Sequence, residues 1–243
     1  MMNVRCGILF NGRQNLFLDY LVWIVNTSKI KNFELSYVHT NNEELVKDLD
    51  INLGTYENVI ENSDIVFSLG YWKKIPKNDI DAVKMGIVNF HHSYELKFQG
   101  RHCATWALMH NECVHGSTMH FIDEKIDEGK IIDSDFFAID DDDVAEDVFL
   151  KSNDIGFKLL KKNFMKLINK NEIDYPCYET KQYSYRKKDL NHEIDILVDS
   201  KLFLRKIKSL TFDDMPAPYI MLEGKKVFLK MEGYDDGKLK KQI

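Results

Sequence analysis

The chain has 243 residues, a formal net charge of −6 and a hydrophobic fraction of 44%, which is ordinary for a globular protein. This length allows one large domain or one domain with a small appendage, and the apolar content excludes a globally disordered chain. The acidic balance argues against a broad surface for nucleic acid or anionic membranes, because both partners need clustered basic charge.

We find no sequence signal for secretion or membrane insertion. The start, MMNVRCGILFNGRQ, lacks the long apolar core and the small-residue cleavage site of a signal peptide. No apolar run reaches the roughly 18 residues of a membrane span. The four cysteines, Cys6, Cys103, Cys113 and Cys177, are far apart and form no CxxC pair, so we expect a cytoplasmic protein with reduced thiols.

Short apolar runs alternate with helix-like stretches in the first part of the chain. The runs that predict strands are VRCGILF (4–10), FELSYVHT (33–40), SDIVFSLG (63–70) and GIVNFH (86–91). The stretches that predict helices are 15–28, a polar segment with Leu45, Leu49 and Leu53 at helical spacing, and PKNDIDAVKM. This alternation predicts an α/β fold with a mostly parallel, Rossmann-like sheet, in which ligands bind beyond the carboxyl ends of the strands.

The next segments predict a helix and two strands. RHCATWALMHN (101–111) places Cys103, Trp106, Ala107 and His110 on one helical face. STMHFID and GKIIDSDFFAI then read as strands on either side of the polar turn EKIDE.

The acidic run IDDDDVAEDVF is compatible with a metal site or with the start of a helix. We favour the helix, with Asp143 as its N-cap and Glu146 as the N3 partner, because acidic side chains stabilise a helix N-terminus. The helix is predicted to run to about Asn169. Its expected core stripe consists of Val148, Ile155, Leu159, Phe164 and Leu167.

The composition changes near residue 180, so we divide the chain into a catalytic domain (1–180) and a small C-terminal region (181–243). That region contains the basic, aromatic segment KQYSYRKKDLN and a predicted helix, SKLFLRKIKSLTF. PYIMLEGKKVFLKM predicts a β-hairpin that turns at Glu223–Gly224. Because a hairpin edge is available for pairing with another chain, we expect a homodimer.

Asn89 and His91 are two residues apart at the end of a predicted strand, so their side chains leave the same face of the sheet, whereas His92 points away. An amide N–H stabilises a developing oxyanion, and an imidazole titrates near neutral pH. Acyl transfer to an amine needs both groups. A purely structural role for the pair remains the alternative.

Six of the eight histidines lie between residues 91 and 120, yet their spacing does not match a zinc site. We therefore predict no bound metal. Asp123 and Asp127 lie in the turn between the two later strands, where a carboxylate near an imidazole would orient it or stabilise its protonated form. Without further context, Asp127 is equally compatible with an ordinary turn residue.

From Asn89 to Ile132 the sequence resembles the core of the N10-formyltetrahydrofolate-dependent formyltransferases. The matching positions, in order, are Asn89-Phe90-His91, Ser93, Gly100, Trp106-Ala107, Gly116 to His120, and Asp127-Glu128-Gly129. The resemblance implies that Asn89, His91 and Asp127 are catalytic, with His91 managing the amine proton, and that N10-formyltetrahydrofolate is the co-substrate. His92 stands where the family usually has proline, and YELKFQGR replaces a more apolar loop.

Within that family, the C-terminal region resembles the sugar N-formyltransferases, through LRKIKSLTFDDMPAPYIMLEGKKVFL. The resemblance implies a nucleotide-linked amino sugar, such as dTDP-4-amino-4,6-dideoxyglucose, used for surface polysaccharide such as O-antigen. The alternatives are formylation of another amine such as glycinamide ribonucleotide, a non-catalytic folate or sugar-nucleotide binder, and a histidine-rich metalloprotein. Transfer RNA is a poor partner for an acidic chain with a short C-terminal region.

The binding residues expected from the resemblance and from their places after strand ends fall into two groups. Those expected to bind folate are Gly70, Tyr71, Trp72, Ile75 and Asp123. Those expected to bind the sugar nucleotide are Asn11, Lys77, Ser93, Tyr94, Gly100, Arg101 and Arg186. Arg101, Arg186 and Lys77 are candidates for the pyrophosphate, with an ordinary solvated surface as the alternative. The turn FNGRQN lacks the glycine patterns of dinucleotide and P-loop sites.

Overall fold

The computed structural model describes residues 3–12, 15–31, 33–170, 175–176, 182–212 and 215–231. Cys177 and the predicted boundary near residue 180 lie outside these residues, so the division into two regions stays a prediction. Within the described part of the chain, no helix is both long enough and apolar enough to cross a membrane.

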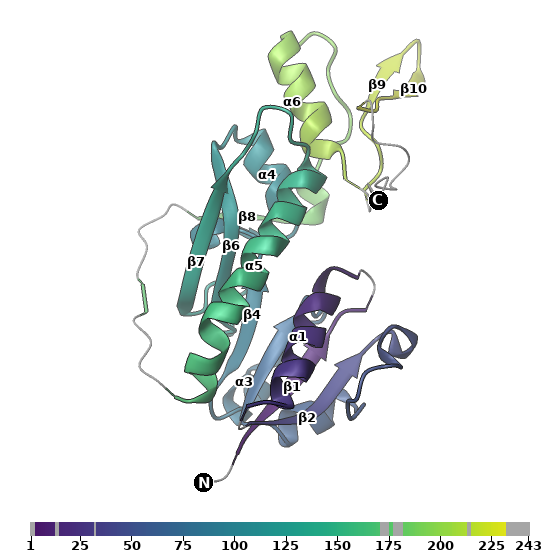
Figure 1. Cartoon of the computed structure of the whole chain (residues 1–243). Coiled ribbons are helices and arrows are strands. Elements are labelled where there is room, and N and C mark those ends of the chain that lie inside the picture. The colour runs from purple at the N-terminus through teal and green to yellow at the C-terminus, as the bar shows by residue number, and fades with distance from the viewer. Residues whose placement is uncertain are drawn as a thin grey trace.

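A six-stranded sheet with the order β2-β1-β3-β4-β6-β7 forms the centre of the molecule (Figure 1). Its strands are β1 (Val4–Phe10), β2 (Phe33–Thr40), β3 (Ile65–Leu69), β4 (Ile87–His91), β6 (Val114–Phe121) and β7 (Ile131–Ala138). The first four strands pair in parallel, whereas β6 pairs antiparallel with both β4 and β7. The predicted Rossmann-like, mostly parallel sheet is confirmed.

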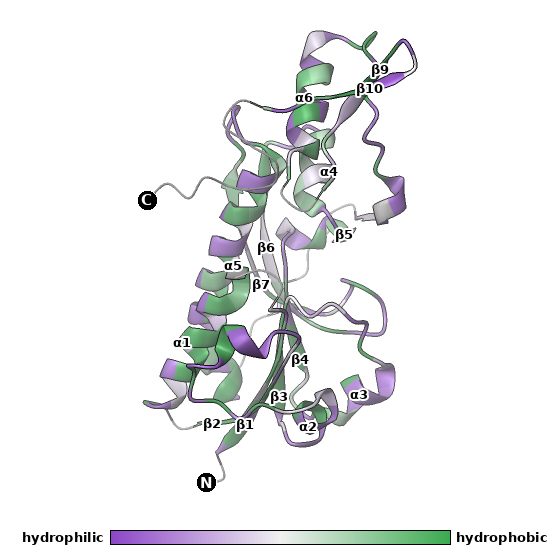
Figure 2. Cartoon of the chain, turned by 90° about the vertical axis from the view of Figure 1, so that its right-hand side faces the viewer, coloured by the Kyte–Doolittle hydropathy of each residue, from purple (hydrophilic) through white to green (hydrophobic). Residues whose placement is uncertain are grey.

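Helices cover both faces of the parallel strands (Figure 2). The helices are α1 (Leu18–Ser28), α2 (Tyr56–Glu61), α3 (Lys77–Ala82), α4 (Cys103–Met109), α5 (Ala145–Ile168) and α6 (Ser200–Leu210). On β1, Ile8 and Phe10 pack toward α1 and α5, and Leu9 packs toward α2 on the opposite face. A strand covered on both faces has no solvent side, which explains the continuous apolar run that predicted it.

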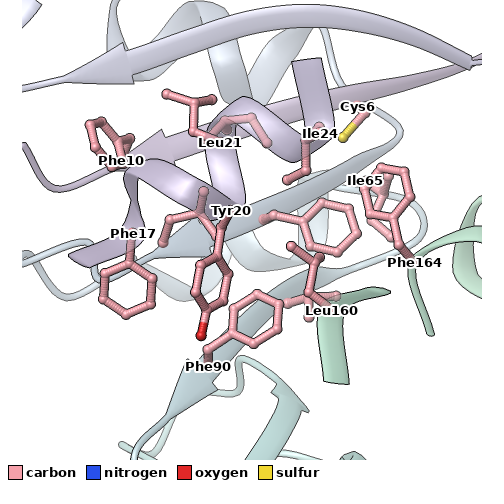
Figure 3. Close-up of a cluster of buried hydrophobic side chains, with 14 of the residues drawn as sticks. Cys6, Phe10, Phe17, Tyr20, Leu21, Ile24, Ile65, Phe90, Leu160 and Phe164 are labelled. Atoms are coloured by element: carbon pink, nitrogen blue, oxygen red, sulfur yellow. The ribbon is translucent and has the colours of Figure 1, made fainter. Parts of the chain in front are cut away.

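The larger core lies between the sheet and the helices α1 and α5 (Figure 3). The rings of Tyr20 and Phe90 meet edge-on with centroids 5.2 Å apart, and Phe164 of α5 packs on Phe67 at 4.9 Å. The Tyr20 hydroxyl donates a 2.6 Å hydrogen bond to the Asn153 carbonyl, so this buried polar atom is satisfied. The predicted core stripe of α5 is confirmed, since all five of its residues are buried.

The N-terminus of α5 differs by one residue from the prediction. Val144 is the N-cap residue, and its backbone N–H donates to the Asp147 carboxylate at 3.0 Å. The Asp143 carboxylate instead accepts a hydrogen bond from the Asp140 backbone N–H and forms an ion pair with Lys151 at 2.7 Å. The predicted capping pair Asp143–Glu146 is therefore wrong, because the Asp143 carboxylate is occupied by Lys151.

The predicted helix through Leu45, Leu49 and Leu53 is also wrong. Only a short 3-10 turn, Glu43–Val46, forms there. Beyond it the chain returns to the sheet, where Val38 donates to the Asn52 carbonyl at 2.9 Å and accepts from Gly54 at 3.1 Å. These sheet contacts replace helical hydrogen bonds, so the leucine spacing does not describe a helix.

The C-terminal region packs at the end of the molecule that carries α4 (Figure 1). Its first strand, β8 (Tyr183–Tyr185), pairs in parallel with β5 (Phe98–Gly100). The predicted hairpin is confirmed as β9 (Tyr219–Leu222) and β10 (Lys225–Phe228). Its two turn residues, Glu223 and Gly224, have φ values of +47° and +75°. Two positive φ values suit the type I′ turn that joins the strands of a hairpin with a two-residue loop.

Candidate active site

A cleft of about 490 Å³ opens beyond the carboxyl ends of β3 and β4, where sheets of this kind bind ligands. Its walls come from the segments after β1 and β3, the end of β4, the β5 segment and the β6–β7 connection. The predicted site residues that line it are Asn11, Gly70, Tyr71, Trp72, Ile75, Asn89, His91, Gly100, Arg101, Asp123 and Asp127. Residues distant in sequence are thus gathered around one space.

Asn89 lies on β4 directly opposite His120 of β6. The His120 Nδ1 atom is 2.8 Å from the Phe121 carbonyl oxygen, which only accepts hydrogen bonds, so Nδ1 carries the proton. The other ring nitrogen, Nε2, therefore accepts from the Asn89 amide nitrogen at 3.2 Å. This contact fixes which way the Asn89 amide faces and leaves its second N–H for a ligand.

His91 follows two residues later and is buried against the β5 segment. Its Nε2 donates a 2.6 Å hydrogen bond to the Phe98 carbonyl, and its Nδ1 lies 3.5 Å from the Asp127 carboxylate. Burial alone would lower the pKa of His91, but Asp127, the Cys103 sulfur and the Phe98 carbonyl outweigh it and raise the pKa to about 10. The imidazole is therefore positively charged at neutral pH.

Asp127 lies in the β6–β7 connection with a left-handed φ of +53°. One carboxylate oxygen accepts the Gly100 backbone N–H at 2.8 Å, while the other faces His91. The same oxygen is 3.8 Å from His120 Nε2, yet burial, opposed by Asp127, lowers the pKa of His120 to about 4. The proton near this carboxylate consequently resides on His91 and not on His120.

Cys103 is a further neighbour of His91, from the first residue of α4. Its sulfur is 3.4 Å from His91 Nε2 and 3.2 Å from the Phe98 carbonyl oxygen. The thiol and the imidazole therefore share one acceptor, and the thiol packs behind the ring, away from the cleft lining. This arrangement gives Cys103 a packing role beside the His91 ring.

His92 points to the opposite side of the strand, as predicted. Its ring stacks on Phe17 with centroids 5.6 Å apart and meets Phe149 at 4.7 Å. In the described part of the chain, no group of three or more His, Cys, Asp or Glu side chains is arranged to hold a metal ion. The two adjacent histidines thus lie in separate environments.

The outer part of the cleft is aromatic and basic. Trp72 packs beside Tyr71 at 4.7 Å and stacks near His39 at 6.3 Å. The lining residues that sequence reasoning did not identify as binding residues are Ser68, Lys73, Lys74, His120, Ile122, Glu124, Lys125 and Ile126. His120 was visible as part of the family motif, but its contact with Asn89 depends on the β4–β6 register.

Four predicted binding residues lie outside the cleft lining. Ser93 is fully buried, and its hydroxyl accepts the Phe98 backbone N–H at 2.8 Å. Tyr94 packs on Phe136 at 5.1 Å. Lys77 forms an ion pair with Asp81 at 3.2 Å. Arg186 is exposed, and its backbone N–H donates to Asp189.

A family model described as formyl transferase matches residues 42–163, about half of the chain. This chain therefore belongs to the formyl transferase family, and the membership predicted from the resemblance between Asn89 and Ile132 is confirmed.

Among curated relatives, the methionyl-tRNA formyltransferase of Fusobacterium nucleatum is 27% identical over 165 residues, which are 67% of this chain and 52% of the relative. The chain thus spans about half the length of the curated relatives it matches.

Among solved structures, a 4-N formyltransferase from Francisella tularensis has a TM-score of 0.80 at 19% identity, covering 96% of this chain and 98% of that one. The N-formyltransferase of Helicobacter canadensis, determined with folinic acid and dTDP-3-aminofucose, has a TM-score of 0.74 at 23% identity, covering 93% and 86%. These likenesses show that the fold is shared, and they extend over the C-terminal region.

Proposed function

We propose that the chain transfers a formyl group from N10-formyltetrahydrofolate to the amine of a nucleotide-linked amino sugar. The observation that carries the proposal is the convergence of Asn89, His91 and Asp127 on one cleft, with His91 and Asp127 3.5 Å apart. An oriented amide, a buried charged imidazole and a carboxylate are the groups that acyl transfer to an amine uses.

In the proposed reaction, the amine nitrogen attacks the formyl carbon, a new C–N bond forms and the bond from that carbon to N10 breaks. One proton leaves the amine and one is delivered to N10, so atoms and charge balance. The formyl oxygen becomes negatively charged on the way. The Asn89 N–H and the His91 cation supply the stabilising charge, and one such donor is typically worth about 3–4 kcal/mol.

The raised pKa of His91 changes the role that the family resemblance implied. A protonated imidazole does not accept the amine proton, so His91 acts as the positive partner of the oxyanion. The Asp127 carboxylate, which lines the same cleft, is the group left to take that proton, and passing a proton on to the leaving N10 restores the carboxylate. Its bond from the Gly100 N–H holds it in place for this step.

The rest of the cleft fits the two proposed substrates. Tyr71, Trp72 and Ile75 form an apolar wall suited to a flat pterin, with Asp123 as a polar partner for its ring nitrogens. Arg101 is an exposed cation at the same cleft, suited to a pyrophosphate. We favour dTDP-4-amino-4,6-dideoxyglucose or a close relative, for surface polysaccharide such as O-antigen. Support for a 4-amino position comes from the Francisella tularensis 4-N formyltransferase, 98% of which this chain covers.

Turnover of a panel of amines with N10-formyltetrahydrofolate tests the proposal. The panel contains dTDP- and UDP-linked 3-amino and 4-amino sugars, glycinamide ribonucleotide and methionyl-tRNA, and mass spectrometry detects the added formyl group. We expect formylation of a dTDP-linked amino sugar, and no formylation of glycinamide ribonucleotide or methionyl-tRNA. Turnover of glycinamide ribonucleotide or methionyl-tRNA alone would overturn the substrate class, and no turnover of any amine would overturn the proposed activity.

A further inference from the structure

Two glutamines connect the catalytic turn to the C-terminal region. Gln99 lies on β5, immediately before Gly100, and only 6% of it is exposed. Its side-chain nitrogen donates to the Asp127 carbonyl oxygen at 3.3 Å and to the side-chain oxygen of Gln182 at 3.1 Å. Gln182 immediately precedes β8, and 83 positions in the sequence separate it from Gln99.

Hydrogen-bond chemistry fixes the orientation of both amides. The Asp127 carbonyl only accepts, so Gln99 must turn its NH₂ group, and not its oxygen, toward it. The second hydrogen of the same NH₂ group then needs an acceptor, and the Gln182 oxygen provides it. Both hydrogens of the buried Gln99 amide are thereby used, and neither is left unsatisfied.

The turn that carries Asp127 requires such support. Asp127 has a left-handed φ of +53°, which is unfavourable for a residue with a Cβ. Backbone crowding is severe two residues later, because a Cβ at Gly129 would collide with the Phe121 carbonyl oxygen. Adjacent residues of β5 hold the turn from both ends: Gly100 bonds the Asp127 carboxylate and Gln99 bonds its carbonyl.

The β8 strand in turn holds β5 in place. Tyr183 donates its backbone N–H to the Lys97 carbonyl at 2.7 Å, and the Tyr185 ring stacks on Trp106 of α4 with centroids 3.9 Å apart. At Gly100, φ is +86° and an added Cβ would be 2.7 Å from the Tyr185 carbonyl oxygen, so the two strands are in close contact.

We infer that Gln99 and Gln182 are positioning residues that keep the Asp127 carboxylate aimed at the reacting amine. This inference rests on the proposed function, because it assigns Asp127 the role of proton acceptor. It gives the C-terminal region a part in the reaction that is separate from substrate binding. Loss of the contact should lower the rate of the chemical step and leave the affinity for both substrates unchanged.

The test compares Gln182→Leu, which lacks an acceptor, with Gln182→Glu, which keeps one. We expect Gln182→Leu to lower kcat by about ten-fold with both KM values within about two-fold of wild type. Gln182→Glu should restore most of the lost kcat. Gln99→Met, which removes the donor itself, should lower kcat at least as far as Gln182→Leu. Ser184→Ala, at an exposed position on the same strand, is the matched control and should be indistinguishable from wild type.

A readout independent of turnover separates this inference from the proposed function. In protein with ¹⁵N-labelled histidine, the His91 ring signal, assigned with His91→Ala, should titrate at lower pH in Gln182→Leu than in wild type. Among the described residues, the titratable groups that interact with this ring are Asp127, Cys103, His120, His92 and His115, and Asp127 is the one that the Gln99–Gln182 contact holds. Wild-type kcat and an unmoved His91 signal in Gln182→Leu, or failure of Gln182→Glu to recover, would overturn the inference. An inactive wild type with a shifted signal would overturn the proposed function alone.

Discussion

His91 and His120 face the same oxygen of Asp127, yet they differ in charge at neutral pH. Both rings are buried, which disfavours a charge on either. His91 is closer to the carboxylate and directs Nε2 to a carbonyl, so both of its nitrogens face acceptors. His120 instead uses Nε2 to accept from Asn89, a contact that requires the neutral ring. A hydrogen-bond partner, more than burial, therefore separates the roles of the two histidines.

Asn89→Ala removes the amide that would face the oxyanion. We expect kcat to fall by about 10²–10³ while the KM values change little, because the lost interaction forms in the transition state. Steady-state kinetics on the amine identified by the panel measures this effect. Circular dichroism confirms that the fold is retained, and a kcat within ten-fold of wild type would remove Asn89 from the catalytic group.

His92 and His115 are also buried, and both are neutral at pH 7. Burial, assisted by the charge on His91, lowers the pKa of each to about 3. An unfolded histidine titrates near 6.5, so below that pH the unfolded state binds more protons than the folded state. As the pH decreases below 6.5, each of these histidines should therefore lower the free energy of unfolding by about 1.4 kcal/mol per pH unit. The raised pKa of His91 acts in the opposite window, since its contribution is full below 6.5 and is lost as the pH approaches about 10.

The variant His92→Phe tests this pH dependence. It keeps a ring between Phe17 and Phe149 but removes the titrating group. Urea unfolding between about pH 6 and pH 4 should show a shallower loss of stability than in wild type, by about 1 kcal/mol per pH unit. Ser184→Ala, at an exposed position that carries no titrating group, serves as the control and should keep the wild-type slope. Parallel slopes for His92→Phe and wild type would contradict the prediction.

At the scale of elements, hydrogen bonds hold the loop between β4 and α4 in place despite its polar sequence. Its residues with positive φ are Glu95 (52°), Leu96 (55°), Gly100 (86°) and His102 (62°). Side-chain hydroxyls pin this backbone: Ser93 accepts from the Phe98 N–H at 2.8 Å, and Thr118 donates to the Ser93 carbonyl at 2.6 Å. Unfavourable backbone conformations persist only where the surroundings fix them, so this loop is preorganised.

Replacing Ser93 by alanine should therefore act on stability. The Phe98 N–H is buried and would lose its acceptor, which typically costs about 1–3 kcal/mol. We expect Ser93→Ala to lower the free energy of unfolding in urea by that amount. Ser184→Ala, at an exposed serine, should leave it unchanged, and equal midpoints for the two variants would contradict this account.

Elements that rest on local pattern could be predicted from the sequence. The buried run of β1, the apolar stripe of α5 and the Glu223–Gly224 turn each carry their signal within a few residues. The segment after β2 and the cap of α5 could not, because their hydrogen-bond partners come from elsewhere in the chain.

The same distinction applies to the site. Asn89 and His91 follow from strand alternation, and Asp127 follows from the family motif. The contacts of His120, Gln99 and Gln182 depend on strand register and on pairing between distant segments, which periodicity does not encode.

At the scale of the molecule, the β9–β10 hairpin lies at the end of the structure that also carries α6 (Figure 1), and apolar side chains remain exposed on it. On the hairpin these are Met221 (39% exposed), Leu222 (43%), Val227 (41%) and Phe228 (58%). Neighbouring exposed apolar residues on a strand pair are typical of an interaction surface. We expect two copies to associate through this hairpin.

Phe228→Asp should weaken that association, because it places a charge among the apolar contacts. Size-exclusion chromatography with light scattering should show a dimer for wild type and a monomer for the variant. Lys230→Asp, which changes charge just beyond the hairpin, is the control and should remain dimeric. A monomeric wild type at micromolar concentration would contradict the prediction.

The pairing of β5 with β8 also has a consequence for the order of assembly during synthesis. A ribosome delivers the whole six-stranded sheet and α5 before it delivers Gln182. A nascent chain that has folded this much has the larger core between the sheet, α1 and α5, but the turn that carries Asp127 still lacks its outer support. Catalytic competence should therefore arrive late in translation, and a message truncated after α5 should give a protein that folds around its sheet without an effective catalyst.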